Sequence, residues 1–191
     1  MNIELLLNAY CQGIFPMSDE HGDIYWYDPD PRAILPLDTF HVPRSLAKRV
    51  QWGGFEVRMD TAFREVMEFC AAPAPGRETT WINREIIESY CTLHRSGFAH
   101  SVETWMDDRL VGGLYGVSIR GLFAGESMFS HATDASKIAL VYLVEHLQRR
   151  HFTLLDIQFM TEHLRRFGAV EISRQAYHHR LARALRVRTD F

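Results

Sequence analysis

The fold is decided by the stretch "AHSVETWMDDRLVGGLYGVSIRGLFAGESMFS", residues 99–130. Residues 99–106 and 110–119 have the composition of two strands, and Asp107-Asp108 is a turn pair between them. Residues 121–130 continue the series as a third strand. Consecutive strands joined by such short turns pair antiparallel. The stretch therefore predicts an antiparallel meander.

Working outward from the meander, helices and strands alternate on both sides. Residues 55–59 read as a strand, and two helices follow, the first expected to be capped by Asp60. After the meander come a helix with a broad apolar side over 135–150, a strand over 153–160, and two further helices that begin after Thr161 and Ser173. A meander that crosses over through a helix to another strand predicts an α+β protein.

The N-terminal part has a different character. Asn2 is placed to cap a helix that ends at Gly13. Five prolines then fall between residues 16 and 43, which excludes a long helix and predicts an irregular segment with short strands. Aromatic residues crowd this segment, so we expect it to pack against the rest of the protein as a lid or a small subdomain.

The amino-acid composition limits the classes of protein to which this chain can belong. The chain has 191 residues, is 47% apolar and carries a net charge of −3, so it has a sizeable core and no global positive field. Its three scattered cysteines form no zinc-binding pattern and suit a reduced, cytoplasmic setting. No apolar run reaches the roughly 20 residues that span a membrane, and the N-terminus lacks the features of a secretion signal.

Three polar residues interrupt apolar strands. In a regular strand Glu126 shares a face with Ala124 and Met128, and Asp156 and Gln158 project side by side from one face of their strand. Burying such groups is costly unless they have partners. Two interpretations stay open, a ligand pocket and a buried hydrogen-bond network that ties strands together.

Other motifs carry weaker signals. "RRFGAV", residues 165–170, faintly resembles a loop that cradles the pyrophosphate of coenzyme A, but a glycine that ends a helix explains Gly168 equally. Gly112 and Gly116 could floor a pocket or allow tight packing of the sheet.

Many segments together resemble one family, the leucyl/phenylalanyl-tRNA–protein transferases. In order along nearly the whole chain these are "AYCQGIFPM", "WYDPDPRAILPL", "HVPRSL", "TWI", "LHRSGFAHSVETW", "LVGGLYGV", "GESMFS", "ASKIAL", "LLDIQ" and "GAVEISR". The resemblance implies an acetyltransferase-like (GNAT-related) mixed sheet with flanking helices that uses no acetyl-coenzyme A. It also implies a shortened N-terminal domain over residues 1–30 and a catalytic domain over residues 31–191.

The same resemblance implies an activity. Family members transfer Leu or Phe, and possibly Met, from aminoacyl-tRNA to the N-terminal Arg or Lys of an acceptor protein, which marks that protein for degradation through the N-degron pathway. We therefore expect a monomeric cytoplasmic enzyme without contact to a membrane. An aminoacyl ester is already activated, so neither a metal nor another cofactor is expected.

Family motifs map onto residues of this chain. The catalytic candidates are Gln158, Asp156 and Glu126. We expect Gln158 to orient the attacking amine, and Asp156 either to polarise the amide of Gln158 or to help the proton leave. Glu126 could bind the α-amino group of the transferred residue or hold the network around Gln158 in place. The substrate-binding candidates are Tyr10, Trp81, Leu114, Phe123, Met128, Ser130, Leu140 and Leu143. The tRNA-binding candidates are Arg44, Lys48, Arg49, Arg77 and Arg84. Met17 stands where some family members have a tryptophan that would stack on the terminal adenine.

Two other functions remain alternatives. A non-catalytic module that binds tRNA or a peptide could keep the pocket but would not need the pair Asp156 and Gln158. An acyltransferase that uses coenzyme A could share the fold. Binding of acetyl-coenzyme A or of an aminoacyl adenosine would distinguish these alternatives from the aminoacyltransferase.

Overall fold

The structure is a computed structural model that describes residues 1–73 and 79–191. Arg77, one of the predicted tRNA-binding residues, lies outside the described residues. The helices are α1 (Ile3–Cys11), α2 (Arg44–Trp52), α3 (Phe63–Ala71), α4 (Arg84–Arg95), α5 (Ala135–Arg149), α6 (Glu162–Arg165) and α7 (Arg174–Ala184). The strands are β1 (Phe15–Ser18), β2 (Ile24–Tyr27), β3 (Arg32–Ile34), β4 (Glu56–Met59), β5 (Ala99–Met106), β6 (Arg109–Ile119), β7 (Leu122–Ser130), β8 (Leu154–Gln158) and β9 (Val170–Ile172).

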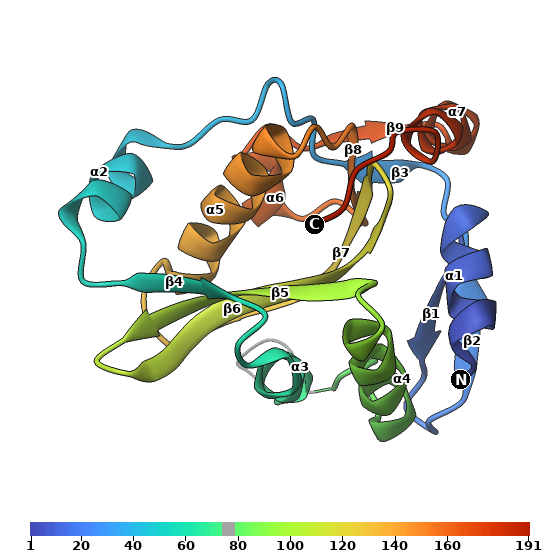
Figure 1. Ribbon diagram of the computed structural model, residues 1–191, viewed down its shortest axis with the longest axis horizontal. Coiled ribbons are helices and arrows are strands. Elements are labelled where there is room, and N and C mark those ends of the chain that lie inside the picture. The colour runs from blue at the N-terminus through green and yellow to red at the C-terminus, as the bar shows by residue number, and fades with distance from the viewer. Residues whose placement is uncertain (74–78) are drawn as a thin grey trace.

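One large sheet organises the molecule, with the strand order β4-β5-β6-β7-β8-β3-β9 (Figure 1). Strands β5, β6 and β7 form the predicted antiparallel meander, and α5 then crosses over to β8, which pairs parallel with β7. The α+β class with a mixed sheet and flanking helices is therefore confirmed. The sequence did not predict β9, whose three residues are too few to show a periodicity.

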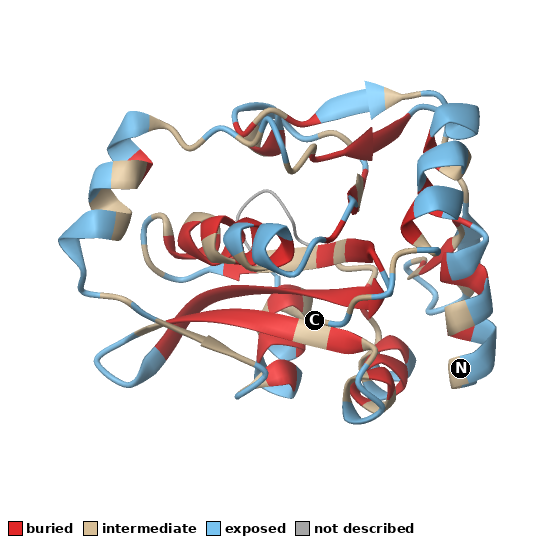
Figure 2. Ribbon diagram, turned by 45° about the horizontal axis from the view of Figure 1, so that its top comes forward, coloured by how far each residue is buried: buried red, intermediate tan, exposed pale blue. Residues whose placement is uncertain are grey.

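Helices cover the meander on both faces (Figure 1). On one face, α5 contributes Leu140 and Leu143 to a core shared with Leu114. On the other face, α3 and α4 pack through residues such as Val66 and Tyr90. Figure 2 shows buried residues along the central strands and on the inward sides of these helices, whereas α2 and α7 present long exposed stretches.

The N-terminal segment is built into this architecture. Leu6 and Tyr10 of α1 belong to the same hydrophobic cluster as α4, and β3 runs inside the large sheet between β8 and β9. Strands β1 and β2 pair with each other as a separate hairpin. The segment predicted to be irregular, with short strands, is thus packed against the rest of the protein and contributes a strand to the large sheet.

The predicted role of Asp60 as the cap of α3 is wrong. Asp60 adopts a left-handed backbone conformation, with φ 60°, and its carboxylate accepts the backbone N–H of Ser101. Buried Glu103 on β5 accepts the backbone N–H groups of Thr61 and Ala62 instead. A carboxylate from a neighbouring strand thereby satisfies donors at the start of the helix. Within residues 1–73 and 79–191, no helix is long and apolar enough to cross a membrane.

Candidate functional site

A β-bulge in β7 places Glu126. Ser127 pairs with Tyr115 of β6 and Gly125 pairs with Gly116, which leaves Glu126 as the extra residue. A bulge interrupts the alternation of faces along a strand. Phe123 and Met128 accordingly pack into one hydrophobic cluster, although alternation would separate them. The expected common face of Ala124, Glu126 and Met128 is therefore wrong.

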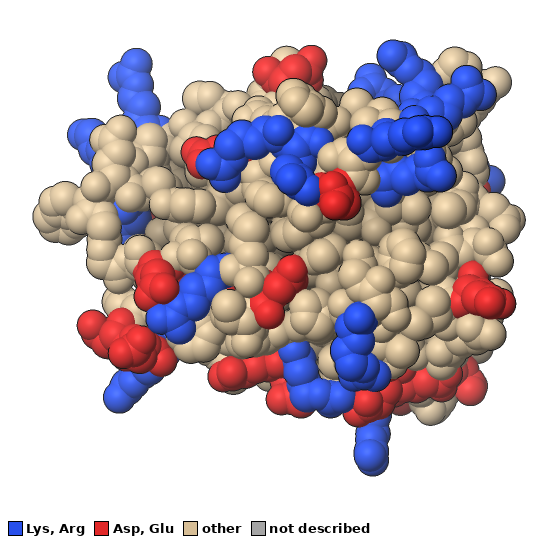
Figure 3. Space-filling model, viewed as in Figure 1, with Lys and Arg blue, Asp and Glu red and all other residues tan. Residues whose placement is uncertain are grey.

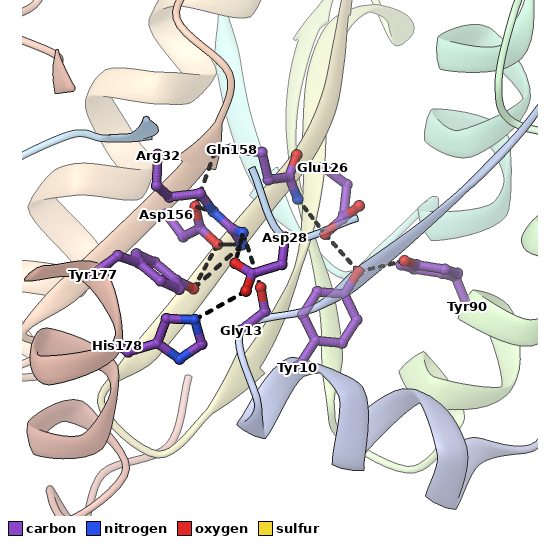
Figure 4. A network of polar contacts seen from close by, with 10 residues as sticks. All are labelled: Tyr10, Gly13, Asp28, Arg32, Tyr90, Glu126, Asp156, Gln158, Tyr177 and His178. Atoms are coloured by element: carbon purple, nitrogen blue, oxygen red, sulfur yellow. Dashed lines mark hydrogen bonds and ion pairs between the residues drawn. The ribbon is translucent and has the colours of Figure 1, made fainter. Parts of the chain in front are cut away.

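A second break in strand geometry places Gln158 at the end of β8. Its backbone is left-handed, with φ 62°, and its N–H donates to Oδ1 of Asp156 at 2.9 Å. Such a conformation is uncommon for a residue other than glycine. The two side chains turn to different partners, with Gln158 toward Glu126 and Asp156 toward Arg32 (Figure 4). The prediction that Asp156 and Gln158 project side by side is wrong for this reason.

Glu126 and Gln158 meet in a buried network (Figure 4). Nε2 of Gln158 donates to Oε1 of Glu126 at 2.9 Å, and the hydroxyl of Tyr10 donates to the same oxygen at 2.7 Å. The hydroxyls of Tyr10 and Tyr90 are themselves hydrogen-bonded. Oε2 of Glu126 is buried and has no partner among the described residues. Because the amide nitrogen of Gln158 donates to Glu126, the amide oxygen Oε1 of Gln158 is left to accept a hydrogen bond.

Burial dominates the electrostatics of Glu126. It raises the pKa of this carboxyl from 4.5 to about 8, against the hydrogen bond from Tyr10, which favours the charged form. Burial also raises the pKa of the Tyr10 hydroxyl, and the nearby Glu126 adds to the effect. Burial therefore favours the neutral carboxyl near pH 7, and a cation placed beside Oε2 would favour its ionised form.

Asp156 belongs to a different network. Arg32, only 1% exposed, donates from Nε to Oδ1 at 2.9 Å and from Nη2 to Oδ2 at 2.6 Å. The hydroxyl of Tyr177 donates to Oδ2 at 2.8 Å. Arg32 also donates to the carbonyl oxygen of Gly13 at 2.8 Å. Asp156 is thus fully engaged away from the pocket and holds the backbone of Gln158 in place.

Sequence reasoning missed Arg32 and Tyr177. A signal for Arg32 was present, because a charge directly before the apolar run "AILPL" must find a partner when the run is buried. Tyr177 carried no such signal, since an aromatic residue on the inward face of a helix is ordinary core.

An apolar pocket of about 410 Å³ opens beside Glu126 and Gln158. The pairing of β7 with β8 ends at Ala124 and Asp156, and the pocket lies just beyond this point, between the two strands. Its lining includes the predicted residues Trp81, Leu114, Met128, Leu140 and Leu143. It also includes residues that the sequence did not single out, namely Phe15, Tyr115, Gly125, Ser127, Leu155, Ile157, Phe159, Thr161, His163 and Leu164. Met17 lines it as well.

Three predicted substrate-binding residues do not line this pocket. Phe123 precedes the bulge and is fully buried in the core. Ser130 lies at the end of β7, where its hydroxyl accepts the N–H of Ser136 at the start of α5. Tyr10 is buried behind Glu126 and reaches the pocket only through the carboxyl of that residue. Phe123 and Ser130 therefore lie outside the lining of this pocket, and Tyr10 is connected to it by its hydrogen bond to Glu126.

The described residues predicted to bind tRNA do not form one patch. Arg44 and Lys48 are exposed on α2, where Arg49 is half-buried with its guanidinium 5.5 Å from the ring centroid of Phe55. Arg84 is exposed on α4, on another part of the molecule (Figure 1). Only α2 thus supplies neighbouring basic side chains from this set.

Comparison with known proteins places the site in a family context. The sequence profile "Leucyl/phenylalanyl-tRNA protein transferase" matches residues 34–182, and the profile of that family's N-terminal domain matches residues 1–30. A leucyl/phenylalanyl-tRNA–protein transferase from Phenylobacterium zucineum is 57% identical over 188 residues, which cover 97% of this chain and 85% of the relative. One from Herpetosiphon aurantiacus is 57% identical over 189 residues, which cover 98% of this chain and 96% of the relative.

Matches to solved structures have low sequence identity. L-PGS from Bacillus licheniformis superposes with a TM-score of 0.50 and 12% identity, over 95% of this chain and 70% of that protein. A GCN5-related N-acetyltransferase from Kribbella flavida gives a TM-score of 0.44 at 12% identity, over 84% of this chain and 57% of its own. The likeness to L-PGS concerns the arrangement of the sheet and helices alone.

Proposed function

Because this chain belongs to the leucyl/phenylalanyl-tRNA–protein transferase family and is thus an aminoacyltransferase that acts on aminoacyl-tRNA and a protein, we propose that its pocket holds the transferred residue and that Gln158 orients the attacking amine. The observation that carries the proposal is the fixed amide of Gln158 at the wall of an apolar pocket. Glu126 holds the amide nitrogen, so the amide oxygen is the group left for a ligand.

The lining of the pocket supports Leu and Phe as donors, with Met as a further one. Leu114, Met128, Leu140 and Leu143 offer an apolar wall to an unbranched Cβ. Ile and Val carry a second substituent at Cβ that would crowd this wall. One methylene or methyl group changes binding in such a pocket by only about 1–3 kcal/mol, so selectivity among apolar side chains should be incomplete.

Transfer requires few groups. The neutral amine of the acceptor attacks the ester carbonyl carbon, the bond from that carbon to the ribose oxygen breaks, and the ribose oxygen takes up the proton that the amine releases. Gln158 is not a base of useful strength, so its Oε1 accepts a hydrogen bond from the amine and directs the nitrogen lone pair at the carbonyl. Holding amine and ester together in this way can lower a barrier by roughly 7–11 kcal/mol in well-oriented systems.

Glu126 and Asp156 act on either side of Gln158. The unpaired Oε2 of Glu126 is placed to accept a hydrogen bond from the α-ammonium group of the donor residue, while its Oε1 fixes the amide. Asp156 is a positioning residue, because its contact with Gln158 is through the backbone N–H. The earlier expectation that Asp156 polarises the amide of Gln158 is replaced by this role.

We further propose the remaining features that the resemblance to the family implies. The acceptors are proteins with an N-terminal Arg or Lys, which transfer marks for degradation through the N-degron pathway, and the enzyme works as a cytoplasmic monomer. Residues 1–30 form the small N-terminal domain, which supplies Tyr10 to the site, and residues 31–191 form the catalytic domain.

A transfer assay tests this function. Charged tRNAs are mixed with a peptide that begins with Arg, in the presence and absence of EDTA and without ATP. We expect labelled Leu or Phe to appear on the peptide, less Ile or Val, and none on a matched peptide that begins with Asp. Absence of transfer from every charged tRNA, or complete loss with EDTA, would contradict the proposal. Tight binding of acetyl-coenzyme A without binding of an aminoacyl adenosine would favour the coenzyme A alternative.

A further inference from the structure

Helix α7 and the residues that follow it are rich in arginine. Between Arg174 and Arg188 lie five of the chain's 21 Lys and Arg residues and none of its 24 Asp and Glu residues. The net charge of the whole chain is −3, so this stretch runs against the overall balance. Figure 3 shows Lys and Arg side chains gathered at the end of the molecule where α7 lies.

The arginines lie on the outer side of the helix. Tyr177, Leu181 and Ala184 are buried against the sheet, whereas Arg180 and Arg183 are exposed. Arg186 and Arg188 extend the exposed series beyond the end of the helix. We name these four exposed arginines, Arg180, Arg183, Arg186 and Arg188, the α7 basic face.

The α7 basic face has no acidic partner in the described protein. Arg174, at the start of the helix, pairs with Asp28 at 3.7 Å, and His178 contacts the same carboxylate. In contrast, none of the four arginines of the α7 basic face forms an ion pair with a described residue. Their charges are therefore available to an anionic partner.

A groove of about 720 Å³ runs beside this face. Its polar lining consists of Thr153, Ser173, Gln175, His179, Arg180 and Arg183, and among the residues that the structure describes no carboxylate lines it. Each of these side chains can donate a hydrogen bond, and the two arginines can only donate, which suits phosphate oxygens. Arg180 and Arg183 are three positions apart, so their side chains lie beside each other along the groove.

We propose that the α7 basic face and its groove bind the phosphate backbone of the donor tRNA, an inference that rests on the proposed function. Repeated unpaired arginines next to a groove with donors fit a polyanion with regularly spaced phosphates. A membrane surface fits less well, because helices that lie on lipid insert large apolar residues. The apolar residues of α7 are instead buried in the protein.

The position of α7 also connects this surface to the reaction site. Tyr177 on the inner side of the helix donates to Asp156, and Asp156 accepts the backbone N–H of Gln158. A tRNA bound to the outer side of α7 would thus contact a helix whose inner side is hydrogen-bonded to β8 through Tyr177 and Asp156.

Binding of deacylated leucine-accepting tRNA over a series of salt concentrations tests the proposal. The variant carries Arg180→Gln, Arg183→Gln and Arg186→Gln. Its matched control carries Arg64→Gln, Arg95→Gln and Arg109→Gln, which remove the same charge from exposed residues on α3, α4 and β6. We expect the α7 variant to bind roughly 10–100-fold more weakly. The slope of log affinity against log salt concentration should become shallower by the amount that corresponds to about two to three lost phosphate contacts. Lysine at the three α7 positions should restore most of the affinity.

Two further measurements complete the test. The Michaelis constant for charged tRNA should rise in the α7 variant, whereas transfer from leucyl-adenosine, which has no phosphate backbone, should stay unchanged. Equal loss of tRNA binding in the α7 variant and its control, or wild-type binding in the α7 variant, would overturn the proposal. So would binding of phosphatidylglycerol vesicles that depends on the three arginines while tRNA binding does not. Binding of deacylated tRNA requires no transfer reaction. A failure of the proposed function and a failure of this proposal can therefore be told apart.

Discussion

At the scale of single residues, the site depends on two places where a strand departs from regular geometry. Glu126 is the extra residue of a bulge, and Gln158 is left-handed at the end of its strand. Each departure turns a polar side chain toward the other across the line where β7 and β8 part. Arg32 forms an ion pair with Asp156, whereas Glu126 beside the pocket has no ion-pair partner among the described residues.

The buried carboxyl of Glu126 makes stability depend on pH. Its pKa is about 8 in the folded protein and 4.5 by default, so the folded state binds more protons than the unfolded state between these values. The free energy of unfolding therefore falls as pH rises from 4.5 to 8, by roughly 4 kcal/mol from this group.

Glu126→Gln should remove that dependence while it keeps an oxygen for Tyr10 and Gln158. Chemical denaturation at pH 5 and pH 9 should show the variant gaining stability relative to the wild type at the higher pH. Parallel pH profiles of the two proteins would mean that Glu126 ionises at an ordinary pKa.

At the scale of elements, the sequence predicts regular structure well and its interruptions poorly. The meander, α5 and α7 follow from periodicity and caps, and the polar residues Glu126, Asp156 and Gln158 stand out because they interrupt apolar strands. The bulge and the left-handed residue have no periodic signature, so the direction of these side chains could not be predicted. The pair Arg32 and Asp156 joins positions far apart in the chain, which a single sequence does not reveal.

The approach of α5 to β6 depends on one glycine. A Cβ on Gly112 would lie 2.4 Å from the Cβ of Ala135 and 2.8 Å from its backbone carbon. Gly112→Ala should therefore destabilise the protein by about 1–3 kcal/mol, as overpacking does. Gly125→Ala is the matched control, because its nearest contact would be 3.5 Å. Urea unfolding of both variants measures the difference, and equal stabilities would contradict this account of the packing.

At the scale of the whole molecule, basic side chains lie at two distant ends. Helix α2 carries Arg44, Lys48 and Arg49 at one end, and the α7 basic face lies at the other (Figure 1). The site sits between them, in the splay of β7 and β8. A tRNA that contacts both ends would cross the protein with its 3′ end near the pocket.

Charge reversal at Arg44, Lys48 and Arg49 together should weaken tRNA binding and reduce its salt dependence, because phosphate contacts release counterions. Distant sites contribute independently to binding free energy. A variant that combines these charge reversals with the three glutamine substitutions on α7 should therefore lose a tRNA binding free energy equal to the sum of the two separate losses. If reversal on α2 alone lowers transfer from leucyl-adenosine as much as from tRNA, α2 does not contact the tRNA body.

The central claim is that Gln158 orients the attacking amine and does not bind the donor. Single-turnover transfer and the dissociation constant of a donor analogue are measured for Gln158→Ala, Asp156→Asn, the double variant and Glu126→Ala. Gln158→Ala should lower the rate by roughly 10²–10³-fold with donor affinity nearly intact, as removal of one preorganised polar group does. Asp156→Asn should act in the same direction, and the double variant should lose much less than the sum, because Asp156 works through Gln158.

Glu126→Ala is the comparison within this measurement, since its Oε2 contacts the donor in our account and the variant should lose donor affinity as well as rate. The decisive value is the single-turnover rate of Gln158→Ala with saturating donor. We predict a large loss at unchanged donor affinity. A wild-type rate, or a defect that disappears once donor is saturating, would contradict the assignment of Gln158 to the reacting amine.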